Sequence, residues 1–149
     1  MKIHAFALAI LCAMAAPVGA AEEESSRFDV YVSNQCADDT IGQRLTYSVK
    51  EGLNKSTTMV SGEQNESLFH LRLICLSPDA SDRGNWSHYA YEITLLNTKG
   101  YYDFALTFGV GRCGSSRVAE CAEGLVATID GAISELRKHI ADGSFAIPH

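Results

Sequence analysis

A glycine-rich motif is the feature of this sequence most often associated with chemistry. Gly109-Val110-Gly111-Arg112-Cys113-Gly114 is a formal GxGxxG that follows a strand pattern and precedes a helical pattern. In dinucleotide-binding domains such glycines let the backbone approach a pyrophosphate at a helix N-terminus. That use also needs a further strand with an acidic residue, and no strand pattern follows the helix. We therefore predict no cofactor, and expect a tight corner that leaves room for Cys113 to form a disulfide.

Polar side chains in the middle of the chain form a second group of interest. Two segments alternate with period two, so His70 and Arg72 share a face with His88 and Glu92. Such a face is either a binding surface or a His/Asp acid–base site. Open antiparallel sheet faces normally carry solvated groups, and an Arg72–Glu92 ion pair contributes about 0.2–1 kcal/mol. The full set expected on this face is His70, Arg72, His88, Glu92, Thr94, Asp103 and Thr107.

Two aromatic residues complete the candidate binding residues. Trp86 and Tyr101 both fall next to predicted turns, where an exposed aromatic side chain can anchor a partner. The sequence contains neither a GxSxG nucleophile motif nor an HExxH zinc motif. We therefore predict no catalytic residue and no metal site.

The N-terminal segment has the pattern of a secretory signal peptide. A basic start at Lys2 precedes an apolar run over 3–16, and small residues follow up to Ala20. We predict cleavage after residue 20, a disordered lead-in over 21–27, and a periplasmic or extracellular protein. The apolar run is shorter than the roughly 20 residues of a membrane-spanning helix, so no membrane insertion is expected after cleavage.

Four cysteines follow this predicted signal peptide. In an exported chain an even number of cysteines favours disulfides, whereas zinc or redox sites need spacings that are absent here. Four cysteines allow three connectivities. Cys113 and Cys121 lie close together across a strand-to-helix corner, so we favour Cys113–Cys121 together with Cys36–Cys75.

Hydrophobic periodicity predicts the elements that must position these residues. Strands are expected over 28–33, 57–60, 69–75, 89–95 and 102–110. A helix over 41–54 carries Ile41, Leu45, Val49 and Leu53 on one side, with its N-cap among 38–40. A second helix, capped by Ser115 and Ser116, runs to about residue 140.

The last three strands should form an antiparallel meander. A four-residue turn over 97–100 makes Ile93 face Phe104 and makes Thr94 face Asp103. This register also sets Tyr91 opposite Leu106, and it directs five apolar side chains inward: Tyr102, Phe104, Leu106, Phe108 and Val110. On the other side of the middle strand, aligning Tyr91 with Leu73 sets Arg72 opposite Glu92. Residues 77–86 are expected to form a surface loop.

These elements predict an α+β fold of element order β-α-β-β-β-β-α. The expected architecture is a two-layer sandwich, in which two helices cover one face of a mostly antiparallel sheet. Residues 28–143 should form this single domain, and 144–149 a tail. In element order the chain resembles the small βαβββα domains of bacterial envelope proteins, such as the TolB amino-terminal domain and the penicillin-binding-protein activators. The resemblance implies a domain that binds other envelope proteins, and it assigns no residue a role.

The sequence therefore favours an exported, non-enzymatic domain that binds another envelope or secreted macromolecule. The net charge of −6 argues against nucleic acid and anionic membrane surfaces as partners. One alternative is a small secreted enzyme with a His/Asp site on the open sheet face. Another is an inhibitor or immunity-type protein. The pattern leaves the oligomeric state open.

Overall fold

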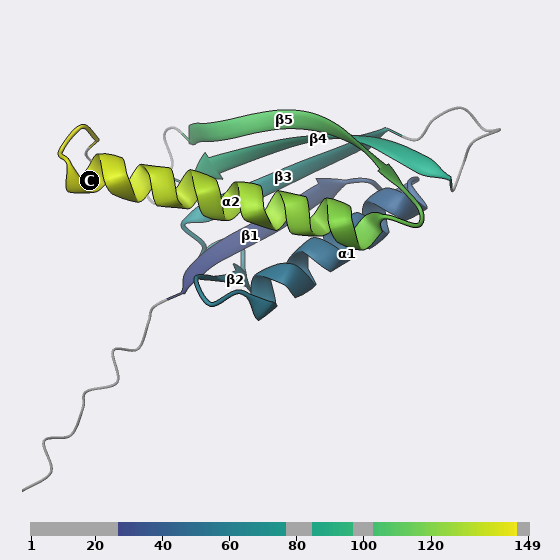
Figure 1. Ribbon diagram of the computed structural model, residues 1–149, viewed down its shortest axis with the longest axis horizontal. Helices are drawn as coiled ribbons and strands as arrows, with labels where there is room; N and C mark the ends of the chain where they lie inside the picture. The colour runs from purple at the N-terminus through teal and green to yellow at the C-terminus, as the bar shows by residue number, and fades with distance from the viewer. Residues whose placement is uncertain (1–26, 77–84, 97–102, 146–149) are drawn as a thin grey trace, which may run out of the picture.

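Two helices cover one face of a single five-stranded sheet (Figure 1). The computed structural model describes residues 27–76, 85–96 and 103–145. Within them the elements are β1 (Phe28–Gln35), α1 (Thr40–Lys55), β2 (Met59–Gly62), β3 (Phe69–Leu76), β4 (Trp86–Leu95), β5 (Phe104–Gly114) and α2 (Val118–Ala141). This confirms the predicted α+β class and element order. Neither of the described helices has the length and apolarity needed to span a membrane.

The sheet is mixed, because its first strand is parallel to both of its neighbours. The strand order is β2-β1-β3-β4-β5. β1 pairs in parallel with β2 and β3, whereas β3–β4 and β4–β5 are antiparallel. Since α1 connects β1 to β2, the parallel half of the sheet is built by a crossover, and the antiparallel half is the predicted meander. Only the antiparallel half leaves a long strand at an edge.

The first helix begins at a buried aspartate. Asp39 is the N-cap of α1, and its Oδ1 accepts a hydrogen bond of 2.9 Å from the backbone nitrogen of Gly42. The helix then buries Ile41, Leu45 and Val49 against the sheet, as its apolar periodicity predicts. The second helix differs from expectation at its start. Arg117, not Ser115 or Ser116, is its N-cap, and no side chain caps it.

The register between β3 and β4 agrees with the prediction, with Arg72 opposite Glu92 and Leu73 opposite Tyr91. The predicted register between β4 and β5 is wrong. Ile93 lies opposite Thr107 rather than Phe104, and Thr94 lies opposite Ala105 rather than Asp103. The pairing shifts between Ile93 and Thr94, which leaves one additional residue, Leu106, on β5 as a β-bulge.

This register also corrects the face on which β5 side chains lie. Tyr91 lies opposite Gly109, not opposite Leu106. After the bulge, Phe108 and Val110 point away from the helices and are 80% and 85% exposed, although the alternation predicted both in the core. A bulge inverts the alternation because strand side chains have a period of two. Tyr102 lies outside the described residues.

The GxGxxG motif belongs to β5 and not to a corner before the helix. Gly109 and Gly111 lie directly opposite Tyr91 and Tyr89. A Cβ atom at Gly109 would collide with the Tyr91 ring, and one at Gly111 with the Tyr89 ring. The two glycines therefore make space for tyrosine rings that lie across the strand, which is a packing role.

The hydrophobic core lies between the helices and the sheet. It includes Phe69, Leu71, Leu73, Ile93 and Ile129, none of which is more than 2% exposed. Both favoured disulfides are present, Cys36–Cys75 and Cys113–Cys121. The first joins the segment before α1 to β3, and the second joins β5 to α2. Each disulfide thus fastens a helix start to the sheet.

Thr94 provides a test of the packing around the sheet. Its hydroxyl is buried and has no hydrogen-bond partner within the described part of the chain. Replacing Thr94 with valine keeps the shape and removes the unpaired hydroxyl, so the free energy of unfolding should rise by about 1 kcal/mol. Urea unfolding measures the change.

Thr46 is the matched control for this substitution. It is equally buried, but its hydroxyl donates a hydrogen bond of 2.9 Å to the Gly42 carbonyl. Thr46→Val should therefore lower stability, by about 1 kcal/mol. A Thr94→Val variant that is no more stable than the unmodified protein would mean that the Thr94 hydroxyl has a partner in solution.

Candidate functional site

The sheet face that the helices leave uncovered holds most of the predicted site residues. We call it the open face (Figure 1). Its side chains come from alternate positions of four neighbouring strands, as the pairings show. They are Tyr31 and Ser33 of β1; His70, Arg72, Ile74 and Leu76 of β3; Trp86, His88, Ala90, Glu92 and the buried Thr94 of β4; and Phe108, Val110 and Arg112 of β5.

His70 is anchored at one end of the open face. Its Nε2 lies 2.7 Å from the Ser33 hydroxyl, and its ring is 5.1 Å from the Tyr31 ring. Burial, followed by the positive charge of Arg72, lowers the pKa of His70 below its usual value, against the opposing charges of Asp103 and Glu92. Both causes favour the neutral imidazole. His70 therefore acts here as a hydrogen-bonding residue held in place by β1.

Arg72 and Glu92 form the predicted cross-strand ion pair beside His70. Their nearest charged atoms are 4.0 Å apart, and their side chains are 50% and 42% exposed. At this distance and exposure the pair contributes at most about 1 kcal/mol to stability. Both groups remain accessible to a partner from the solvent side.

Trp86 and His88 lie together at the other end of the open face. Their ring centroids are 4.5 Å apart in an edge-to-face arrangement. The guanidinium of Arg112, opposite His88 on β5, lies 5.6 Å from the Trp86 ring centroid. This is cation–π geometry, and no sequence pattern indicates that Arg112 takes part in it. The indole is held by its neighbours on the sheet surface.

The two polar ends are too far apart to form one catalytic site. His70 lies opposite Thr94 on β4, and His88 is six positions earlier on the same strand. At about 3.3 Å per residue the separation is roughly 20 Å. The structure therefore brings His70, Arg72 and Glu92 together, and separately Trp86 and His88. Tyr101 lies outside the described residues.

An apolar patch that the sequence did not reveal lies between these ends. Ile74, Ala90 and Val110 are cross-strand neighbours on β3, β4 and β5, and Leu76 and Phe108 adjoin them. Four of these side chains are markedly exposed: Ile74 by 37%, Leu76 by 66%, Phe108 by 80% and Val110 by 85%. Contiguous exposed apolar residues of this kind mark interaction sites. We call these five residues the apolar patch.

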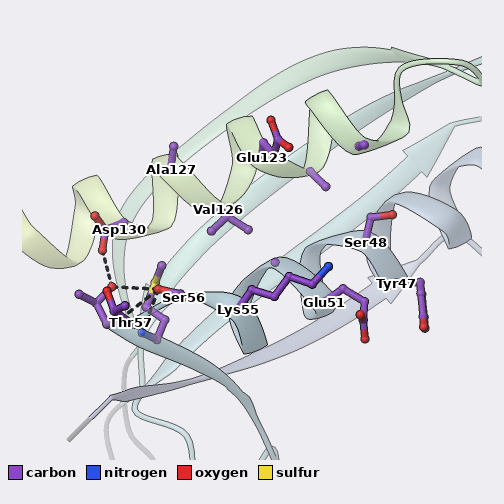
Figure 2. A pocket seen from close by; sticks show the side chains of 15 residues that line it. Tyr47, Ser48, Glu51, Lys55, Ser56, Thr57, Glu123, Val126, Ala127 and Asp130 are labelled. Carbon is purple, nitrogen blue, oxygen red and sulfur yellow. Dashed lines mark hydrogen bonds between the residues drawn. The ribbon is translucent and has the colours of Figure 1, made fainter. Parts of the chain in front are cut away.

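A groove lies on the opposite side of the molecule, between α1 and α2 (Figure 2). It has a volume of about 860 Å³, and the small residues Gly52 and Ala122 are among those that line it. Val126 points into it, and Asp130 accepts a hydrogen bond of 2.8 Å from Thr58 at one end. Two further cavities of about 420 Å³ border β5. None of the three is lined by His70, His88 or Asp103.

Within the residues that the structure describes, no group of three or more His, Cys, Asp or Glu side chains is placed to hold a metal ion. Comparison of the chain with models of protein families finds no match, and comparison with curated proteins finds none either. Function must therefore be inferred from the residues and their geometry.

Proposed function

We propose that this chain is an exported, non-enzymatic interaction domain that binds another protein of the cell envelope or secreted fraction through its open face. The observation that carries the proposal is the apolar patch. Phe108 and Val110, on the edge strand β5, are more than three-quarters exposed, and monomeric proteins rarely place large apolar groups together on their surface. A partner surface that covers the patch would remove this area from water and gain from the hydrophobic effect.

The polar residues around the patch supply specificity. Arg72 and Glu92 flank it on one side and His88 flanks it on the other, so the patch has a charged and hydrogen-bonding border. Protein interfaces commonly combine an apolar centre with such a polar rim. The candidate residues His70, Arg72, His88, Glu92 and Trp86 thus serve as rim contacts.

Two disulfides support the exported location, because disulfides persist in oxidising compartments such as the periplasm. The resemblance in element order to βαβββα envelope domains points the same way, toward a binding role. The enzyme alternative would need a cavity at His70, His88 or Asp103, and the three cavities have other linings. An inhibitor or immunity-type protein would be one form of the proposed binding domain.

Affinity capture with matched variants tests the proposal. The full chain, exported and purified, is used to capture proteins from an envelope extract of its own host. Leu76→Lys and Arg72→Glu alter the patch and its rim, and we expect at least about tenfold lower recovery of the specific partner. Tyr47→Lys is the control, because Tyr47 is 67% exposed on α1, on the helix side of the molecule.

The comparison between variants decides the outcome. A partner that is retained by Tyr47→Lys and lost by Leu76→Lys supports binding through the open face. A partner recovered equally by all variants would assign binding to another surface. Recovery of no specific partner by the unmodified chain would remove the basis for a binding role.

A further inference from the structure

The last strand of the sheet is an exposed edge with an unusual composition. β5 has 11 residues and ends the strand order, whereas β2 at the opposite edge has only four. Natural edge strands are normally shortened, charged or interrupted by proline, because their free backbone groups pair with other chains. β5 contains no proline, and Arg112 is its one charged residue. Its bulge at Leu106 lies near its start, so the stretch from Thr107 to Gly114 is regular.

We propose that β5 pairs antiparallel with β5 of a second copy of this chain, which gives a two-fold symmetric dimer with one continuous sheet. This proposal is separate from the proposed function. Edge pairing uses backbone groups and leaves outward side chains on the open face. The dimer would therefore join the two apolar patches into one surface and would not cover them.

The side chains of β5 are self-complementary in such a pair. With the two-fold axis at Gly109, Phe108 of one copy lies beside Val110 of the other, on the open face. Aromatic and β-branched residues are favourable cross-strand neighbours. The exposure of Phe108 and Val110 would fall, because each would gain a neighbour across the new strand pair.

The charges of β5 do not oppose such a pair. With the axis at Gly109, Arg112 of each copy lies opposite Leu106 of the other, three positions from Asp103, which directly precedes β5. Arg112 forms no ion pair within the described residues. The net charge of −6 would oppose self-association, but β5 itself carries no acidic residue.

The helix above β5 leaves room for a second copy. Gly124 and Gly131 of α2 are exposed, and a Cβ atom at either would meet nothing within 4 Å. The fold of one copy therefore does not require glycine there, although glycine is unfavourable inside a helix. Gly131 and Thr128 face β5, since both line the cavity of about 420 Å³ that Leu106 also borders. Small residues on this side allow the second copy's helix to approach.

Sedimentation equilibrium of the exported, purified full chain tests the proposal. We expect a dimer with a Kd in the micromolar range, which is typical of a modest interface. Phe108→Lys should weaken dimerisation by about 100-fold, because a lysine would replace the central apolar contact. Tyr47→Lys, on the helix side, should leave the Kd unchanged.

A pair of opposite charges tests the register of the pair. Val110→Glu should weaken dimerisation as Phe108→Lys does, and the double variant should recover most of the loss, because the two new charges lie side by side across the strand pair. Circular dichroism of each variant checks that it is folded, and Val110→Glu still tests the pairing if Phe108→Lys unfolds. A monomeric unmodified chain at about 100 µM would overturn the proposal. So would a double variant weaker than both single variants. Neither result depends on any captured partner.

Discussion

Replacing Cys36 and Cys75 together with alanine is expected to lower the free energy of unfolding by about 4 kcal/mol. The bond spans a sequence separation of 39 residues. A crosslink restricts the unfolded chain, and in the chain-entropy description a loop of this length corresponds to about 4 kcal/mol at 25 °C. For a domain of this size, that is a large share of the usual 5–15 kcal/mol of total stability.

The surroundings of this disulfide add to the expected loss. Cys36 is 1% exposed, and the bond packs against Gly42 in the first turn of α1, where a Cβ atom would collide with Cys75. Removing the two sulfur atoms leaves space beside the Asp39 cap of the helix. The start of α1 should therefore loosen first, and hydrogen exchange of the α1 amides would rise more than exchange in β4.

The other disulfide is the matched control. Cys113–Cys121 spans a separation of eight residues, so its removal is expected to cost about 2.5 kcal/mol. Urea unfolding of both double-alanine variants, compared with the unmodified protein, measures the two losses. Equal losses, or a larger loss for Cys113–Cys121, would show that loop length does not determine the contribution of each bond.

Local patterns predicted much of this fold because they were reinforced by neighbouring residues. The four-residue spacing of Ile41, Leu45 and Val49 defines one side of α1, and the preceding aspartates define its start. The β3–β4 register was predictable because apolar and polar residues alternate regularly on both strands, so that a slip would expose the core residues. The disulfide pairing was favoured because Cys113 and Cys121 lie close together across the end of a strand and the start of a helix, which leaves Cys36 and Cys75 as the other pair.

Periodicity gave the wrong faces for β5 because the residues between its large apolar side chains are small and mark no face as polar. Phe104, Leu106, Phe108 and Val110 alternate with alanine, threonine and glycine, so nothing in the pattern marks the bulge. The inward positions after the bulge are Thr107, Gly109, Gly111 and Cys113. The space beside the two glycines is filled by tyrosine rings from β4. Periodicity cannot reveal a core contact made by a neighbouring strand. The parallel pairing of β1 with β2 results from the crossover through α1, and the alternation of residues within β1 does not indicate it.

The face on which the candidate site residues lie could be predicted only for strands with regular alternation. His70, Arg72, His88 and Glu92 lie on strands with regular alternation, and all four are on the predicted face. The apolar patch was missed because its two most exposed residues, Phe108 and Val110, come from β5, where the bulge inverts the faces. Phe108 and Val110, which carry the proposed function, therefore lie on the open face because of one extra residue, Leu106, in the bulge.

Gly111→Ala is expected to lower the free energy of unfolding by about 2 kcal/mol. The added Cβ atom would collide with the Tyr89 ring, which lies directly opposite on β4. Overpacking of this kind typically costs 1–3 kcal/mol, because the ring and the strand must shift together. The ring is confined: it is partly buried against the core, and burial, followed by the nearby Tyr91, raises the pKa of the Tyr89 phenol.

The third glycine of the motif provides the control. A Cβ atom at Gly114 would meet the Asn85 carbonyl oxygen at 3.8 Å, an ordinary contact, so Gly114→Ala should change stability little. If the Tyr89 ring is the cause, Tyr89→Ala combined with Gly111→Ala should cost less than the sum of the single changes, by about 1 kcal/mol. Additive losses in urea unfolding would reject the ring as the reason for Gly111. If Gly111 belonged to a nucleotide-binding motif, a ligand would require the glycine, and replacing Tyr89 could not relieve the loss caused by Gly111→Ala.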